Sequence, residues 1–146
     1  MDCLPLILAL SLAEGDQLCV YRDSLKHPTV CRGHLVTPRD HLTLGQCVAA
    51  QRCTQLFHQD LQVAIATVAR LWPEWETYPE AAQEVLVQLA YMLGEPHLKS
   101  FHRLRTAVTG HDWRRAAQEL QESRLTRRLP KRTCHLIGQL RAIPPP

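Results

Sequence analysis

Apolar residues recur at helical spacing along most of the chain, and this pattern favours a fold made mainly of helices. The first such stretch covers about residues 44–71 and is stopped by Pro73. A loop with two tryptophans follows, and a helix is then expected over residues 80–93, where Gly94 would provide the C-cap. Three further helices are expected at about residues 98–108, 112–124 and 130–140, the last of them starting at Pro130.

The N-terminal segment CLPLILALSLA is the most apolar part of the chain. Its eleven residues are too few to cross a bilayer, so no stable membrane insertion is expected. The segment has no basic region before it and carries Asp2 instead, which is unlike a signal peptide. We therefore expect a buried helix over residues 3–14, with Glu14 at its end.

The residues between this segment and the first long helix have the pattern of a small hairpin. Residues 18–21 and 29–31 are strand-like, and the residues between them are typical of a turn. The sequence thus predicts a single α+β domain, mostly α-helical, with two lobes and a cleft between them. Its expected parts are a β lobe at about residues 15–42, a helical lobe at about 43–141 and a proline-rich tail at 142–146.

Six cysteines and eight histidines raise the question of a disulfide framework or a metal site. The cysteine spacings match neither a zinc ribbon nor a small secreted scaffold, and no HExxH motif is present. We interpret the cysteines as reduced, mostly buried thiols, and we expect neither a metal nor a cofactor.

Charge is distributed unevenly along the chain. Residues 1–96 carry six basic against eleven acidic side chains, whereas residues 97–146 carry eleven basic against three acidic ones. A basic C-terminal third suggests attraction to a polyanion. A basic nucleic-acid-binding protein is a lesser alternative, but so few aromatic residues accompany the charge that no nucleic acid partner is expected.

The hairpin region places Glu14, Asp23 and Thr29 at short intervals directly after the apolar segment. A carboxyl group at the end of an apolar helix has its pKa raised by desolvation, whereas a carboxylate on an open hairpin stays ionised. Two carboxyl groups separated in this way can act as acid and base in glycoside hydrolysis. By spacing alone the pattern is weak, because a helix-end glutamate and a turn-forming aspartate are common.

Further motifs accompany this triad in a fixed order. The pattern E-x8-D-x5-T followed by Gly33-His34 resembles the catalytic stretch of the phage-type lysozymes, glycoside hydrolase family 24. The likeness extends over nearly the whole chain, through the segments LFHQDL, AYMLGEPHLKSF, DWRRAAQELQESR and LPKR.

The resemblance implies a lysozyme-like fold and a muramidase that cleaves the β-1,4 bond between N-acetylmuramic acid and N-acetylglucosamine in peptidoglycan. Glu14 would be the general acid, Asp23 would position or activate water, and Thr29 would order the same water. The reaction would invert the anomeric carbon, which requires carboxyl groups about 6.5 to 9.5 Å apart. By the same resemblance, three residues would support the site: Arg132 by pairing with the catalytic glutamate, and His34 and Asp60 as an ion pair joining the lobes.

Departures from the family pattern concern the cleft. The segment between the hairpin and the long helix is short, so the β lobe should be small. Leu125 stands where an aromatic residue is frequent, Met92 where a polar residue is frequent, and Cys31 where glycine is frequent.

Two cellular routes are compatible with the sequence. The protein would accumulate in the host cytoplasm as a monomer and reach the wall through a holin-type pore, or it would be carried in the virion with other virion proteins. The alternative class is a catalytically inactive lysozyme-like module that has a structural or wall-binding role in a virion. A chain released from catalysis would have no physical need to retain Glu14, Asp23 and Thr29 together.

Overall fold

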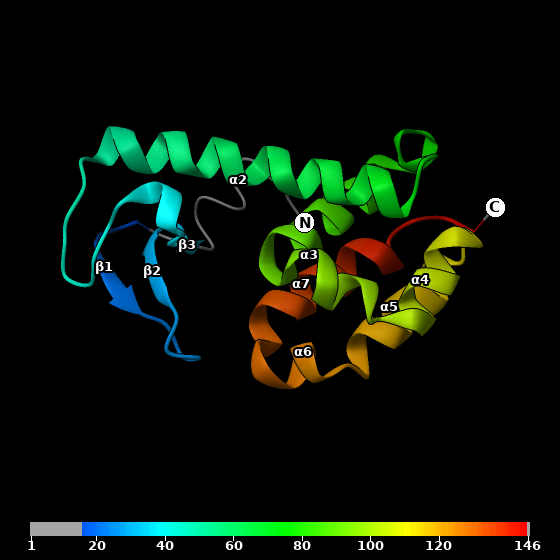
Figure 1. The fold of residues 1–146 in the computed structure, drawn as a ribbon. Coiled ribbons are helices and arrows are strands. Elements are labelled where there is room, and N and C mark those ends of the chain that lie inside the picture. Colours follow the sequence, from blue (N-terminus) through cyan, green and yellow to red (C-terminus); the bar gives the residue numbers. More distant parts are fainter. Residues whose placement is uncertain (1–15, 146) are drawn as a thin grey trace. The chain divides into compact units, whose positions relative to one another are not determined.

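The computed structural model describes residues 16–145, so the expected helix at residues 3–14, including Glu14, lies outside the described part. The chain divides into two compact units at residues 62 and 63. We call the described residues 16–62 the hairpin unit and residues 63–145 the helical unit. Helix α2 (Ala50–Leu71) contributes residues to both units, and its continuous course is seen in Figure 1.

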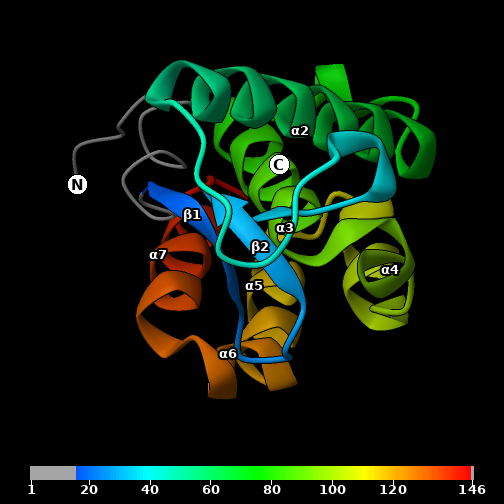
Figure 2. The ribbon, with the colours of Figure 1, turned by 60° about the vertical axis from the view of Figure 1, so that its left-hand side comes forward.

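The hairpin unit contains a three-stranded antiparallel sheet in the order β1-β2-β3. Strand β1 (Gln17–Arg22) pairs with β2 (Pro28–Cys31), which pairs with the two-residue β3 (His34–Leu35), and a 3-10 turn η1 (Pro38–Asp40) follows. Strands β1 and β2 run side by side in Figure 2. The expected hairpin is therefore present, while β3 was not expected.

The first long helix begins at Ala50, six residues later than residue 44, where the apolar pattern begins. The cause is that the preceding segment pairs with β1. Val20 N donates to Gln46 O at 2.9 Å, and Val48 N donates to Leu18 O at 2.8 Å. Gly45 permits the reversal because its φ of 85° lies in the left-handed region that favours glycine.

The helical unit is built from the second half of α2, the 3-10 turn η2 (Trp75–Thr77) and five further helices in its described residues. These five helices are α3 (Glu80–Lys99), α4 (His102–Thr109), α5 (Trp113–Gln121), α6 (Arg124–Arg128) and α7 (Pro130–Arg141). Helix α5 packs on α4 and α7, and α3 packs on α7. Their buried faces meet in a core that includes Leu89, Ala116, Leu120, Leu136 and Leu140.

The helix ends follow from particular residues. Gly94, with φ 74°, interrupts the helical backbone within α3, as its position in the sequence suggests. The Asp112 carboxylate caps α5 by accepting a hydrogen bond from Arg115 N at 3.0 Å. Pro130 occupies the first turn of α7.

The elements together confirm the expected fold class, which is α+β, mostly helical and lysozyme-like. The short helix α6 was not expected.

No helix between residues 16 and 145 is long and apolar enough to cross a membrane.

The expectation of reduced cysteines is wrong for four of the six. Cys19 is bonded to Cys47, and Cys31 is bonded to Cys53. The pairing depends on the return of the chain along β1 and on the position of α2, and neither is visible in the cysteine spacing. Cys134 is an exposed thiol on α7.

Candidate active site

Asp23 lies directly after β1, in the turn that joins β1 to β2. Its Oδ1 accepts hydrogen bonds from the backbone amides of Leu25 at 2.9 Å and His27 at 2.8 Å. The backbone closes the same turn, because Asp23 N donates to His27 O at 3.0 Å. One carboxylate oxygen therefore holds the turn, and the side chain has a fixed orientation.

Thr29 lies on β2, opposite Tyr21 in the register of the hairpin. The residue is buried, at 3% exposure, and its hydroxyl donates to the carbonyl oxygen of His27 at 2.9 Å. Because the hydroxyl proton is used in this bond, the oxygen is left to accept a hydrogen bond from another donor, such as water.

The backbone of His27 connects the two candidate residues. Its amide donates to Asp23, and its carbonyl accepts from Thr29. This role of His27 was not predicted from the sequence, because both contacts are made by the main chain. Asp23 and Thr29 therefore belong to one hydrogen-bonded turn.

The second carboxylate oxygen of Asp23, Oδ2, has a more distant neighbour than Oδ1. Within residues 16–145, the polar group recorded near Oδ2 is Nδ1 of His27, at 3.9 Å, and the Asp23 side chain is 26% exposed. A partly exposed carboxylate of this kind can accept a proton from a nearby water molecule.

His34 follows the hairpin on β3 and bridges two carboxylates. Its Nδ1 lies 2.8 Å from Oδ2 of Asp60 on α2, and its Nε2 lies 2.8 Å from Oδ2 of Asp40 on η1. The structure brings His34 and Asp60 together, and all three residues lie within the hairpin unit. Asp40 was not singled out in the sequence, although its position six residues after His34 is close enough for such a contact.

The protonation equilibria of these groups are shifted by their neighbours. The hydrogen bond to Asp60 raises the pKa of His34, and the bond to Asp40 adds to this, while burial acts in the opposite direction. Burial alone would raise the pKa of Asp40, but hydrogen bonds from the Thr37 backbone and from His34 outweigh it, so that the pKa is lowered. Both shifts favour a charged pair.

Arg132, the third expected supporting residue, lies in the first turn of α7 and is half-buried. It belongs to the helical unit, whereas its expected partner Glu14 lies outside the described residues. The pairing of these two residues stays a prediction.

The positions that depart from the family pattern have distinct environments. Leu125 is buried at 5% exposure, and Met92 is half-buried on α3. Cys31 has a φ of 59°, in the left-handed region, which explains why glycine suits this position. Here cysteine occupies it and is bonded to Cys53.

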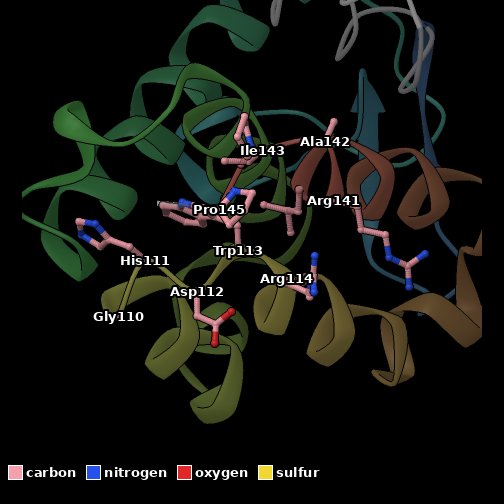
Figure 3. A pocket seen from close by; sticks show the side chains of 11 residues that line it. Gly110, His111, Asp112, Trp113, Arg114, Arg141, Ala142, Ile143 and Pro145 are labelled. Carbon is pink, nitrogen blue, oxygen red and sulfur yellow. The ribbon is translucent and has the colours of Figure 1, made fainter.

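A separate pocket of about 420 Å³ lies in the helical unit. It is formed where α5 begins and where the tail follows α7. The rings of His111 and Trp113 stack there with centroids 5.9 Å apart. Figure 3 shows Trp113, Ile143 and Pro145 near its centre, with His111 and Arg141 at opposite sides. Asp23, Thr29, His34, Asp60 and Arg132, the expected site residues that the structure describes, do not line this pocket.

Comparison of the sequence with known families gives a match over most of the chain. A family model described as phage lysozyme matches residues 11–131. The chain therefore belongs to the phage lysozyme family.

One curated relative is a much longer protein. The pre-baseplate central spike protein Gp5 of Enterobacteria phage T4 is 26% identical over an alignment 131 residues long, and the alignment includes 75% of this chain. The match extends over 23% of that relative, so the chain corresponds to less than a quarter of its length.

Proposed function

We propose that the protein is a muramidase that hydrolyses the β-1,4 bond between N-acetylmuramic acid and N-acetylglucosamine in peptidoglycan. Glu14 would donate a proton to the leaving glycosidic oxygen, and Asp23 would accept a proton from the attacking water. The water oxygen would then bond to the anomeric carbon from the opposite face, with inversion of configuration. The Thr29 oxygen would accept the second hydrogen of this water and so orient it.

The observation that carries this proposal is the shared turn of Asp23 and Thr29. Both side chains are hydrogen-bonded to the backbone of His27, so their relative positions are set by the hairpin itself. A preorganised pair of this kind holds water without a cost of ordering the groups during the reaction. Arg132 would pair with Glu14, and His34 with Asp60 would keep β3 in place against α2.

The basic character of the C-terminal third supports attraction to an anionic cell wall. The protein would act on the wall either as a free lysis enzyme released from the host cytoplasm or as a part of the virion. The second route is favoured by the similarity to a phage protein whose name describes it as a spike.

The test is clearance of purified peptidoglycan, compared between the wild type and Glu14→Gln. The variant should lose activity by at least about a hundredfold, because removal of a general acid typically costs that much or more. Glu76→Gln is a matched control, since Glu76 is exposed in η2, far along the chain from the hairpin. Full activity of Glu14→Gln, with circular dichroism unchanged, would reject the proposal.

The stereochemistry gives a second, independent readout. Proton NMR of the released reducing ends should show the α anomer first, because an inverting enzyme converts the β linkage to an α product. An initial β anomer would mean that a retaining mechanism operates.

The alternative function is a catalytically inactive wall-binding or structural module of a virion. It is favoured by the same similarity to a spike protein. Wild-type protein that sediments with peptidoglycan but releases no reducing ends would support this alternative.

A further inference from the structure

We propose that the two disulfides of the hairpin unit form a redox switch: their reduction unfolds this unit selectively and turns off the activity, and their oxidation restores it. This inference rests on the proposed muramidase function as far as activity is concerned. Its structural part, the dependence of the hairpin unit on oxidation, stands on the geometry alone.

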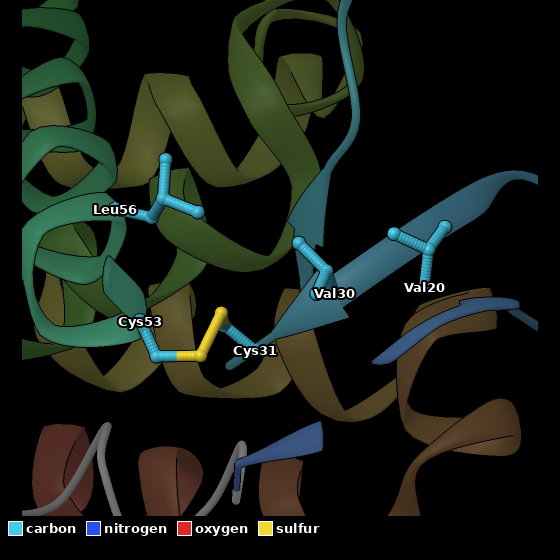
Figure 4. Packing of buried hydrophobic residues seen from close by; sticks show 5 residues of the cluster. All are labelled: Val20, Val30, Cys31, Cys53 and Leu56. Carbon is cyan, nitrogen blue, oxygen red and sulfur yellow. A yellow bond between two sulfur atoms is a disulfide. The ribbon is translucent and has the colours of Figure 1, made fainter. Parts of the chain in front are cut away.

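The first argument is that one of the two bonds is part of the apolar packing of the hairpin unit. One buried cluster contains Val20, Val30, Cys31, Cys53 and Leu56, with three partly buried side chains packed against it. Figure 4 shows the Cys31–Cys53 bond joining β2 to α2 inside this cluster. Two of the five buried members are thus the bonded cysteines themselves, at 1% and 0% exposure. This bond therefore joins β2 to α2 within the apolar packing, and its reduction would leave two separate thiols there.

The second argument is the position of the two bonds around the candidate catalytic turn. Cys19 precedes Asp23 by four residues on β1, and Cys31 follows Thr29 by two residues on β2. Each strand of the hairpin is therefore fixed by its own bond, β1 to the segment at Cys47 and β2 to α2. The bonds close loops of 28 and 22 residues in sequence separation, and closing such loops restricts the unfolded chain substantially.

The third argument is the different exposure of the two bonds. Cys19 and Cys47 are exposed, whereas Cys31 and Cys53 are buried. A thiolate must reach a sulfur atom to exchange with it, so an exposed disulfide reacts first. Reduction of Cys19–Cys47 would loosen the bridge between β1 and the segment at residues 45–48, and the buried bond would become accessible afterwards.

The reaction needs only thiols of the kind present in reducing compartments. Each protein disulfide is reduced by two thiol groups, which become one disulfide, while the two protein sulfurs each gain a proton and an electron. Oxidation by a disulfide donor runs the same exchange in reverse. Reducing cytosol would therefore hold the chain in the inactive form, and an oxidising compartment next to the cell wall would convert it to the active form.

The helical unit should not respond in this way. No disulfide is found between residues 63 and 145, and its core is formed by apolar side chains of α3, α5 and α7. Reduction should therefore lower the stability of the hairpin unit and leave the stability of the helical unit nearly unchanged.

The experiment is hydrogen exchange with mass spectrometry on the full chain, before and after complete reduction, with lysis of peptidoglycan measured in parallel. A Cys3→Ser, Cys134→Ser background removes the other two cysteines and prevents disulfide exchange with them. Amide protection over residues 17–48 should fall between about thirtyfold and a thousandfold on loss of either bond. Amide protection over residues 80–93 and 113–140 should stay within about threefold. Lysis of peptidoglycan should fall together with protection over residues 17–48, and both should return on reoxidation.

Two double variants test the contribution of each bond. Cys19→Ser with Cys47→Ser, and Cys31→Ser with Cys53→Ser, should each lower protection over residues 17–48 without any reductant. When the wild type is reduced slowly by a dithiol reagent, alkylation at successive times should label Cys19 and Cys47 before Cys31 and Cys53.

Several outcomes would overturn the proposal. They are unchanged protection over residues 17–48 after complete reduction, equal loss of protection in both units, or equal lysis by the oxidised and the reduced protein. If protection follows the redox state but neither form lyses peptidoglycan, the muramidase function fails while the redox dependence of the hairpin unit is supported.

Discussion

The imidazole of His34 lies between two carboxylates, with Nδ1 2.8 Å from Asp60 and Nε2 2.8 Å from Asp40. A protonated ring can donate to both of them, whereas a neutral ring can donate to only one. This is why the pKa of His34 is raised, first by the bond to Asp60, although burial of the ring opposes the shift. The contact stabilises the hairpin unit most when the ring is charged.

The stability conferred by this contact should therefore depend on pH. A group with a raised folded-state pKa contributes fully below its unfolded pKa of about 6.5, and the contribution is lost as the pH rises through the folded-state pKa. The lowered pKa of Asp40 acts at the other end, where its contribution is lost as the pH falls through the folded-state value. We expect Asp60→Asn to lower the free energy of unfolding by about 1–3 kcal/mol near pH 5.5, and by clearly less at alkaline pH.

Urea unfolding of the hairpin unit at several pH values measures this difference, and NMR titration of the ring protons locates the folded-state pKa. His58→Asn is the control, because His58 is exposed on the same helix. A loss of the same size at pH 5.5 and at alkaline pH would contradict the prediction.

Cys31 provides a second prediction, since it combines a left-handed backbone with a disulfide. In a Cys53→Ser background the bond is absent, and only the φ of 59° remains as a cost for a side chain at residue 31. Cys31→Gly in this background should be more stable than Cys31→Ser by about 1 kcal/mol, because glycine adopts this conformation without strain. Thermal unfolding of the two double variants gives the comparison, and a less stable glycine variant would show that the lost side chain volume outweighs the strain.

Gly94, at the break within α3, and Gly110, which directly follows α4, form a pair of glycines with different backbone conformations. A Cβ at Gly94 would have space, with its closest neighbour 4.0 Å away, but the φ of 74° disfavours any side chain there. Gly94→Ala should therefore destabilise the protein by about 1 kcal/mol. Gly110 has φ −84°, and its added Cβ would make ordinary contacts, so Gly110→Ala should be neutral or slightly stabilising. Equal effects in calorimetry would contradict this account.

The helices could be predicted because the signals that delimit them are local. Pro73 ends α2, Gly94 interrupts α3, Asp112 caps α5 and Pro130 starts α7, and each acts through its own backbone or side chain. The start of α2 could not be predicted in this way, because residues 45–48 pair with β1, a contact between segments distant in the sequence.

The cysteine pairs were missed for the same reason. Cys19 and Cys47 meet across an antiparallel bridge, and Cys31 meets Cys53 because α2 packs on β2. Sequence spacing contains no information on either event. Asp23 is a different case: it forms the turn, as the common alternative suggested, while its catalytic role stays a prediction.

This double role of Asp23 leads to a prediction that separates structure from catalysis. Asp23→Asn retains an acceptor oxygen for the amides of Leu25 and His27, so the free energy of unfolding should change by less than about 0.5 kcal/mol. Asp23→Ala loses both hydrogen bonds and should cost about 1–2 kcal/mol. Activity on peptidoglycan should fall by about a hundredfold or more in both variants, because neither side chain can accept a proton from water. Glu76→Gln also removes one negative charge and should retain both stability and activity. An active, stable Asp23→Asn protein would show that Asp23 has only its structural role.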